Sequence, residues 1–403
     1  MLTRQRVNGD GDDAAGAASG IRAPGPGSAE HIVDSGVDHH GSVAHMAVST
    51  QRPRGAGVTM RAAVGHNRKR AAEASVMPYS FPTNFVMTSD SLRIAGAQMA
   101  PVWLNRAGTL AKVIAAIHAA ADDGVQLLAF PEAFVPGYPW WIEWTDGARF
   151  DSSVQKALHA HYLDQAVQIE AGHLDDVRAA AKARAITVVL GIIERPLDRG
   201  GHSVYASVVT IDASGAVVTV HRKLMPTYEE RLTWSPGDGH GLRTHRVGAF
   251  TLGALNCWEN WMPLARASLY GQGEDLHVAV WPGSVRNTEE ITRFMAREGR
   301  SYVMSVAGLL RRDQVPEQTP HFALLQRVLP EVMGEGGTCI SGPDAHWLVA
   351  PVAHEERIIA ADVHHVRVRE ERQNFDAMGH YARPDVLQLE VNRERQRAVR
   401  IRD

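Results

Sequence analysis

Cys257 is the residue whose type and surroundings point most directly to chemistry. It lies in FTLGALNCWENWMP, after an apolar stretch that reads as a strand and before a helical pattern. A cysteine at a strand-to-helix junction feels the positive end of the helix dipole, which favours the thiolate. The thiolate is the nucleophilic form, so this position suits attack on an electrophilic carbon. On position alone, an inert core cysteine remains the commoner alternative.

Two further polar residues follow apolar strands in the same way. Glu132, in LLAFPEAFVPGYPWW, has aromatic neighbours that could desolvate its carboxyl and raise its pKa towards that of a general base. Lys223, in VVTVHRKLMP, could stabilise negative charge developing on a substrate. Glu230 could hold this lysine or order a loop. Taken singly, each is better explained as a solvent-facing side chain.

The tryptophans connect these three segments. Seven of the nine lie near them: Trp140, Trp141, Trp144, Trp234, Trp258, Trp261 and Trp281. Clustered tryptophans more often belong to a core than to a pocket. Around three separate strand ends, however, they indicate one shared apolar cavity.

Strands and helices alternate along the part of the chain that carries these residues. The apolar patterns predict strands at 92–98, 125–130, 186–193, 205–211, 216–221, 250–255 and 276–281, from residue 302, and near 337–340, 347–350 and 357–362. Helices are expected between Asn105 and Gly124, through about 152–184, after Cys257 and near 289–299. Hairpins among these elements favour a mixed sheet covered by helices, which is an α/β layered domain.

Composition excludes several classes of protein. The chain has 403 residues, of which 44% are hydrophobic, and a net charge of −3 with scattered basic residues, so we expect no nucleic-acid partner. Its two cysteines cannot build a disulfide framework or a four-cysteine zinc site, and no HExxH pattern occurs. No long apolar run predicts a membrane span, and no apolar segment follows the basic start. A reducing, cytoplasmic setting is expected.

The first 88 residues differ from the rest. They are rich in Gly, Ala, Asp, Ser and Pro, show no sustained period, and are expected to form a disordered, low-complexity extension. We place a compact domain at 89–391 and a short charged tail at 392–403. Our hypothesis is that residues 1–86 are dispensable or arise from an upstream mis-start. A chain beginning at Met87 should then keep its activity and solubility.

Several blocks resemble those of one family. FPEAFVPGYP, HRKLMPTYEERLTWSPGDG and LNCWENWMPLAR are closely similar, in the right order, to the three signature blocks of nitrilases within the nitrilase superfamily. LHVAVWPG, REGRSYV, GGTCISGPD and NFDAMGHYARPDV add further matches. The resemblance covers roughly Leu92 to Val391, and Trp258 after the cysteine is typical of the nitrilase branch.

The resemblance implies an αββα sandwich with a Glu-Lys-Cys triad. It implies that Glu132 is the general base, Lys223 the charge stabiliser, Cys257 the nucleophile and Glu230 an assisting glutamate. It also implies hydrolysis of a nitrile to a carboxylic acid and ammonia through a cysteine thioimidate, without a metal or other cofactor. A homodimer or a larger spiral homo-oligomer is expected, because the superfamily forms dimers that extend into spirals.

The substrate is less constrained. Tyr138, Trp258 and Trp281 suggest a roomy, aromatic-lined pocket, which favours arylaliphatic or aromatic nitriles, while aliphatic nitriles stay open. An amidase or a cyanide-converting enzyme of the same superfamily would use the same triad and is the main alternative. A non-catalytic assembly protein is less favoured because all three triad positions are intact.

Overall fold

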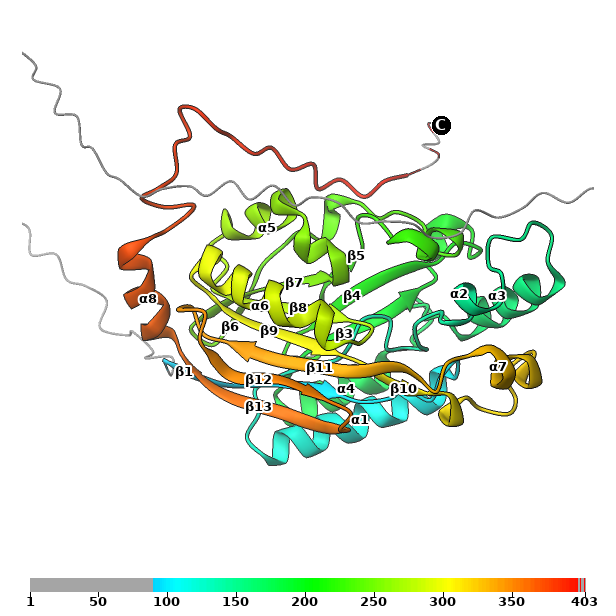
Figure 1. Cartoon of the computed structure of the whole chain (residues 1–403). Helices are drawn as coiled ribbons and strands as arrows, with labels where there is room; N and C mark the ends of the chain where they lie inside the picture. The colour runs from blue at the N-terminus through cyan, green and yellow to red at the C-terminus, as the bar shows by residue number, and fades with distance from the viewer. Residues whose placement is uncertain (1–89, 398, 400–401, 403) are drawn as a thin grey trace, which may run out of the picture. The chain divides into compact units, whose positions relative to one another are not determined.

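The computed structural model describes residues 90–397, 399 and 402. The extension predicted over residues 1–88 lies outside this range. Within it, strands form two sheets, which Figure 1 shows with helices packed against them. No described helix has both the length and the apolar character that crossing a membrane requires.

The first sheet contains six strands in the order β13-β1-β2-β3-β4-β5. Strands β1, β2 and β3 are parallel, and the remaining pairs are antiparallel. Strand β5 therefore runs in the same direction as β2 and β3, so the carboxyl ends of β2 and β5 lie at the same edge of the sheet. The strand bounds are β1 (Ser91–Gln98), β2 (Leu127–Ala129), β3 (Thr187–Glu194), β4 (Tyr205–Ile211), β5 (Val217–Arg222) and β13 (Arg357–His364).

The second sheet has the order β10-β11-β9-β8-β7-β6, and β12 pairs with β11. Its central strands β7, β8 and β9 are parallel. The bounds are β6 (His245–Val247), β7 (Phe250–Asn256), β8 (Leu276–Trp281), β9 (Tyr302–Ala307), β10 (Leu309–Arg311), β11 (Val332–Ser341) and β12 (Trp347–Ala353).

Alternating side chains of the strands build the layers. In β2, Leu128 packs towards the helices α1 (Arg106–Asp122) and α4 (Asp175–Arg184), whereas Leu127 packs towards the second sheet. Helices α5 (Pro263–Tyr270) and α6 (Val285–Gly299) contribute to the cores on the other face of the second sheet. The order of layers is helix, sheet, sheet, helix, which confirms the predicted αββα sandwich. The shorter helices are α2 (Trp141–Trp144), α3 (Ser153–Gln165), α7 (Phe322–Val328) and α8 (His365–Asn374).

Capping residues correctly predicted the ends of the first helix. Asn105 caps α1 by accepting a hydrogen bond of 2.9 Å from the Gly108 N–H, and a left-handed Gly124 follows the helix. The single helix predicted through 152–184 is wrong, because the chain leaves it at Ala166. There the Val167 N–H bonds the Ile193 carbonyl at 2.7 Å, so pairing beside β3 replaces helical hydrogen bonds.

The helix expected directly after Cys257 also begins later. Residues Cys257–Trp261 form a 3-10 turn, and α5 starts at Pro263, a residue well suited to the first position of a helix. The predicted helix near 289–299 begins earlier, at Val285. Strands β6 and β10, each three residues long, were not among the predicted strands.

Candidate active site

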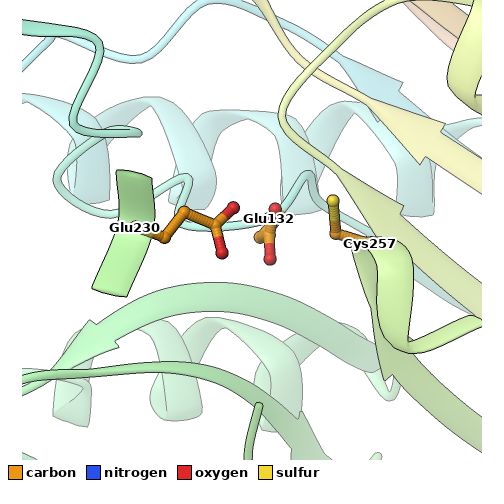
Figure 2. A group of neighbouring side chains, drawn as sticks. All are labelled: Glu132, Glu230 and Cys257. Carbon is orange, nitrogen blue, oxygen red and sulfur yellow. The ribbon is translucent and has the colours of Figure 1, made fainter. Parts of the chain in front are cut away.

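Four polar side chains that the sequence analysis singled out meet at the ends of strands from both sheets. Glu132 follows β2 and Lys223 follows β5, both in the first sheet. Cys257 follows β7 in the second sheet, and Glu230 lies on a 3-10 turn, Tyr228–Leu232, soon after β5. Figure 2 shows Glu132 between Glu230 and Cys257.

The lysine holds the two carboxylates together. Lys223 Nζ donates to Glu132 Oε1 at 2.9 Å and to Glu230 Oε2 at 2.7 Å, and its side chain is only 1% exposed. A carboxylate oxygen of each glutamate and Cys257 Sγ lie within 4.8 Å of one another. The Glu132 carboxylate therefore binds the lysine through one oxygen and lies within reach of the Cys257 thiol, whose hydrogen bond acts to lower the pKa of Glu132.

Burial sets the protonation of these groups. It raises the pKa of Glu132 to about 7, with the negative charge of Glu230 adding to the effect and the Lys223 ammonium opposing it. Burial also raises the pKa of the Cys257 thiol, and the charge of Glu132 raises it further. For Lys223 burial acts to lower the pKa, but the anionic neighbours prevail and raise it. Near neutral pH, Cys257 is therefore a thiol, Lys223 is an ammonium ion, and Glu132 is present in both its protonated and its ionised form.

The backbone is held in an uncommon conformation beside three of these residues. Cys257 itself has φ 46°, Ala133 after Glu132 has φ 51°, and Tyr228 before Glu230 has φ 42°. Side chains with a Cβ rarely adopt such left-handed angles, and they persist where the surrounding structure enforces them, often at active sites.

The comparisons with known proteins show the family of the chain. Residues 93–373 match the carbon-nitrogen hydrolase family. The chain belongs to this family. An arylacetonitrilase of Macrophomina phaseolina is 34% identical over 78% of this chain and 94% of its own length. An aliphatic nitrilase of Rhodococcus rhodochrous is 33% identical over 75% of this chain and 83% of its own. The predicted membership of the nitrilase branch is confirmed.

Solved structures share the fold of this carbon-nitrogen hydrolase. A carbon-nitrogen hydrolase from Helicobacter pylori superposes with a TM-score of 0.56 over 73% of this chain and 96% of its own, at 18% identity. An amidase from Nesterenkonia sp. gives a TM-score of 0.50 over 71% and 95%, also at 18% identity. At this identity the likeness concerns the fold.

The three residues predicted to bind substrate lie in different surroundings. Tyr138 is partly buried, and its hydroxyl donates to Glu230 Oε1 at 2.8 Å, so it contacts the site directly. The Trp258 side chain is 48% exposed, next to the nucleophile. Trp281 is fully buried in one apolar cluster with Cys257, and its indole N–H bonds Ser305. Substrate contact through these three residues stays a prediction.

The space around the acid is smaller than the tryptophan count suggested. A cavity lined by Glu132, Tyr138 and Trp140 has a volume of about 10 Å³, the space of about one water molecule. A hollow of about 450 Å³ lies nearby, lined by residues that include Tyr228, Glu229 and Leu232. Tyr138 lines the small cavity, and its hydroxyl lies 3.4 Å from Oε1 of Glu229, which lines the larger hollow.

Glu132, Glu230 and Cys257 could also be read as ligands for a metal ion. However, the Lys223 ammonium already bonds both carboxylates, and a divalent cation among them would meet this like charge at close range. We therefore assign the positive charge of the site to Lys223.

Sequence reasoning did not single out Glu259, a buried glutamate two residues after the nucleophile. The signal for it was present. Thr227 with Glu230, and Asn256 with Glu259, each form a capping box, in which a glutamate three residues into a turn accepts the N–H of the first residue. Both glutamates make further contacts around the site.

Gly191 of β3 supports the position of the acid. A Cβ at this position would lie 2.0 Å from the Pro131 carbonyl oxygen and 2.8 Å from Glu132 Cα. Gly191→Ala is therefore expected to lower the free energy of unfolding by about 1–3 kcal/mol and to reduce turnover, because the main chain carrying Glu132 must shift. Gly271→Ala, where the nearest atom would be 3.3 Å away, is the control for thermal unfolding and rate. Wild-type turnover in Gly191→Ala would contradict this reasoning.

Proposed function

We propose that this protein is a nitrilase that hydrolyses an organic nitrile to a carboxylic acid and ammonia, with arylaliphatic or aromatic nitriles favoured. The observation that carries the proposal is the Glu132 carboxylate within 4.8 Å of the Cys257 sulfur, with Lys223 bound to the same carboxylate. Relatives named arylacetonitrilase support the choice of substrate.

The first chemical step joins sulfur to carbon. Glu132 takes the thiol proton as Cys257 Sγ attacks the nitrile carbon, one carbon–nitrogen π bond breaks, and the proton passes to nitrogen to give a thioimidate. The Lys223 ammonium balances negative charge that develops on nitrogen. The Trp258 backbone N–H bonds the Cys257 sulfur and stabilises the thiolate as the proton leaves.

Water completes the reaction. Glu132 activates one water molecule, which adds to the thioimidate carbon, and cleavage of the carbon–nitrogen bond releases ammonia and leaves a thioester. A second water molecule releases the carboxylic acid and restores the thiol. Glu230 acts in both steps by holding Lys223 and by accepting the Tyr138 hydroxyl.

We further propose that the protein acts in the cytoplasm as a homodimer or a larger spiral homo-oligomer. Exposed apolar side chains on the second-sheet helices are available for such contacts: Leu264 on α5 is 66% exposed, and Phe294 on α6 is also exposed.

Product analysis tests the main proposal. The purified chain is incubated with phenylacetonitrile, with an aliphatic nitrile, with phenylacetamide and with cyanide, and ammonia, acid and amide are measured. We expect acid and ammonia from phenylacetonitrile, and turnover of the aliphatic nitrile alone would reverse the substrate preference. Hydrolysis of the amide alone would favour an amidase, turnover of cyanide alone would favour a cyanide-converting enzyme, and no turnover of any of them would favour a non-catalytic protein.

The pH dependence follows from the acid. Glu132 must be ionised to accept the thiol proton, and its pKa is about 7. We therefore expect kcat/KM to fall about tenfold for each pH unit below that value and to level off above it. Alkylation of Cys257 by iodoacetamide should follow the same curve. Alkylation that rises only in the alkaline range of free thiols would show that Glu132 does not deprotonate the sulfur.

A further inference from the structure

The proposed reaction depends on the distance between groups that belong to two different sheets. Glu132 and Lys223 follow strands of the first sheet, whereas Cys257 follows β7 of the second. Misplacement of a reacting group by about 1 Å can cost about 100-fold in rate. A contact that fixes one sheet edge against the other beside these residues therefore matters for catalysis.

Glu259 makes such a contact. Glu259 is only 1% exposed, and both of its carboxylate oxygens accept hydrogen bonds. Glu259 Oε1 accepts the Leu224 N–H at 2.7 Å, and Leu224 directly follows the lysine. Glu259 Oε2 accepts the Asn256 N–H at 3.0 Å, and Asn256 directly precedes the cysteine. One carboxylate thus bonds the main chain next to both catalytic side chains.

A third contact comes from the strand that carries the lysine. His221 of β5, also buried, places Nε2 3.0 Å from both oxygens of Glu259. A capping box alone would need only the bond to Asn256. The contacts to Leu224 and His221 join Glu259 to the first sheet. Capping the turn at Cys257 does not require them.

The groups around Glu259 stabilise its negative charge. Burial acts to raise the pKa of Glu259, but the charge of His221, its hydrogen bond and the two main-chain N–H groups prevail and lower it. Hydrogen bonds to an ionised acceptor are stronger than neutral ones. The link that Glu259 makes between the ends of β5 and β7 is therefore strong.

We infer that Glu259 is a positioning residue that sets the distance between the Cys257 thiol and the Lys223–Glu132 pair by tying together the ends of β5 and β7. This inference rests on the proposed function for its turnover measurements. Glu259 itself has no role in proton transfer, because its oxygens are occupied by main-chain and imidazole donors.

The test compares Glu259→Gln with a matched variant far from the site. Asp275 is also a buried carboxylate that accepts a main-chain N–H, from Thr251 at 2.6 Å, and contacts a histidine, His365, at 2.9 Å. Asp275→Asn should lower the melting temperature without changing kcat per folded molecule. Glu259→Gln should lower kcat by about 100-fold with KM changed less than about threefold.

The rate of Cys257 alkylation by iodoacetamide is measured in parallel and needs no nitrile substrate. We expect it to fall in Glu259→Gln and to stay at the wild-type rate in Asp275→Asn. Absence of nitrile turnover in the wild-type chain would refute the proposed function, while the alkylation comparison would still test the positioning role. Equal alkylation rates in all three proteins would overturn that role.

His221→Gln gives an independent result if Glu259→Gln does not fold. It removes the imidazole contact but leaves both main-chain bonds of Glu259 in place. We expect a smaller fall, about tenfold, in kcat and in the alkylation rate, at unchanged KM. Wild-type values for both rates in this variant would overturn the inference.

Discussion

Replacing Cys257 by alanine is expected to reduce nitrile turnover by on the order of 10⁴-fold or more, because the atom that forms the covalent intermediate is lost. The fold should remain, since the side chain only becomes smaller by one sulfur atom. The measurement is ammonia release per folded molecule, with circular dichroism to confirm folding and with mass spectrometry to detect a covalent adduct in the wild-type chain.

The second cysteine provides the matched control. Cys339 in β11 is also buried, burial raises its pKa to about 12, and its sulfur bonds the Thr292 hydroxyl at 3.4 Å among other hydroxyl groups. Cys339→Ser keeps that hydrogen bond and should retain wild-type turnover. Loss of turnover in Cys339→Ser, or normal turnover in Cys257→Ala, would show that the wrong thiol has been assigned.

The sequence was informative where residue type and local pattern agree. Apolar runs before Glu132, Lys223 and Cys257 predicted three strand ends, and the parallel direction of β2 and β5 explains why the first two side chains meet. The layered α/β class followed from the same alternation of elements. These features depend on short stretches of chain, which is why they could be seen without a structure.

Features that depend on distant partners could not be predicted in this way. A lysine at a strand end ordinarily faces solvent, and Lys223 is buried only because carboxylates 91 and seven residues away surround it. The helix predicted through 152–184 breaks because β3 offers Val167 a pairing partner. The full burial of Trp281 in one cluster with Cys257 likewise depends on residues far apart in the chain.

The same buried lysine leads to the second large effect. Lys223→Met removes the only cation bonded to Glu132 and Glu230 among the described residues and leaves two carboxyls buried side by side. We expect turnover to fall by about 1000-fold or more, since charge on the substrate nitrogen is no longer balanced. The free energy of unfolding should fall by about 3–5 kcal/mol at neutral pH, because breaking a buried ion pair leaves its partner uncompensated.

The pH dependence of that loss and a compensating change separate stability from catalysis. Without the ammonium that opposes it, the folded-state pKa of Glu132 rises further above that of the unfolded chain, so the variant should be less stable at pH 8 than at pH 5.5. Lys223→Met combined with Glu230→Gln removes one buried charge and should recover part of the stability, measured by thermal unfolding at both pH values. Turnover should not recover, because the group that balances charge on the substrate is still missing. If the double variant regained activity together with stability, Lys223 would be a structural residue and the chemistry would need another cation.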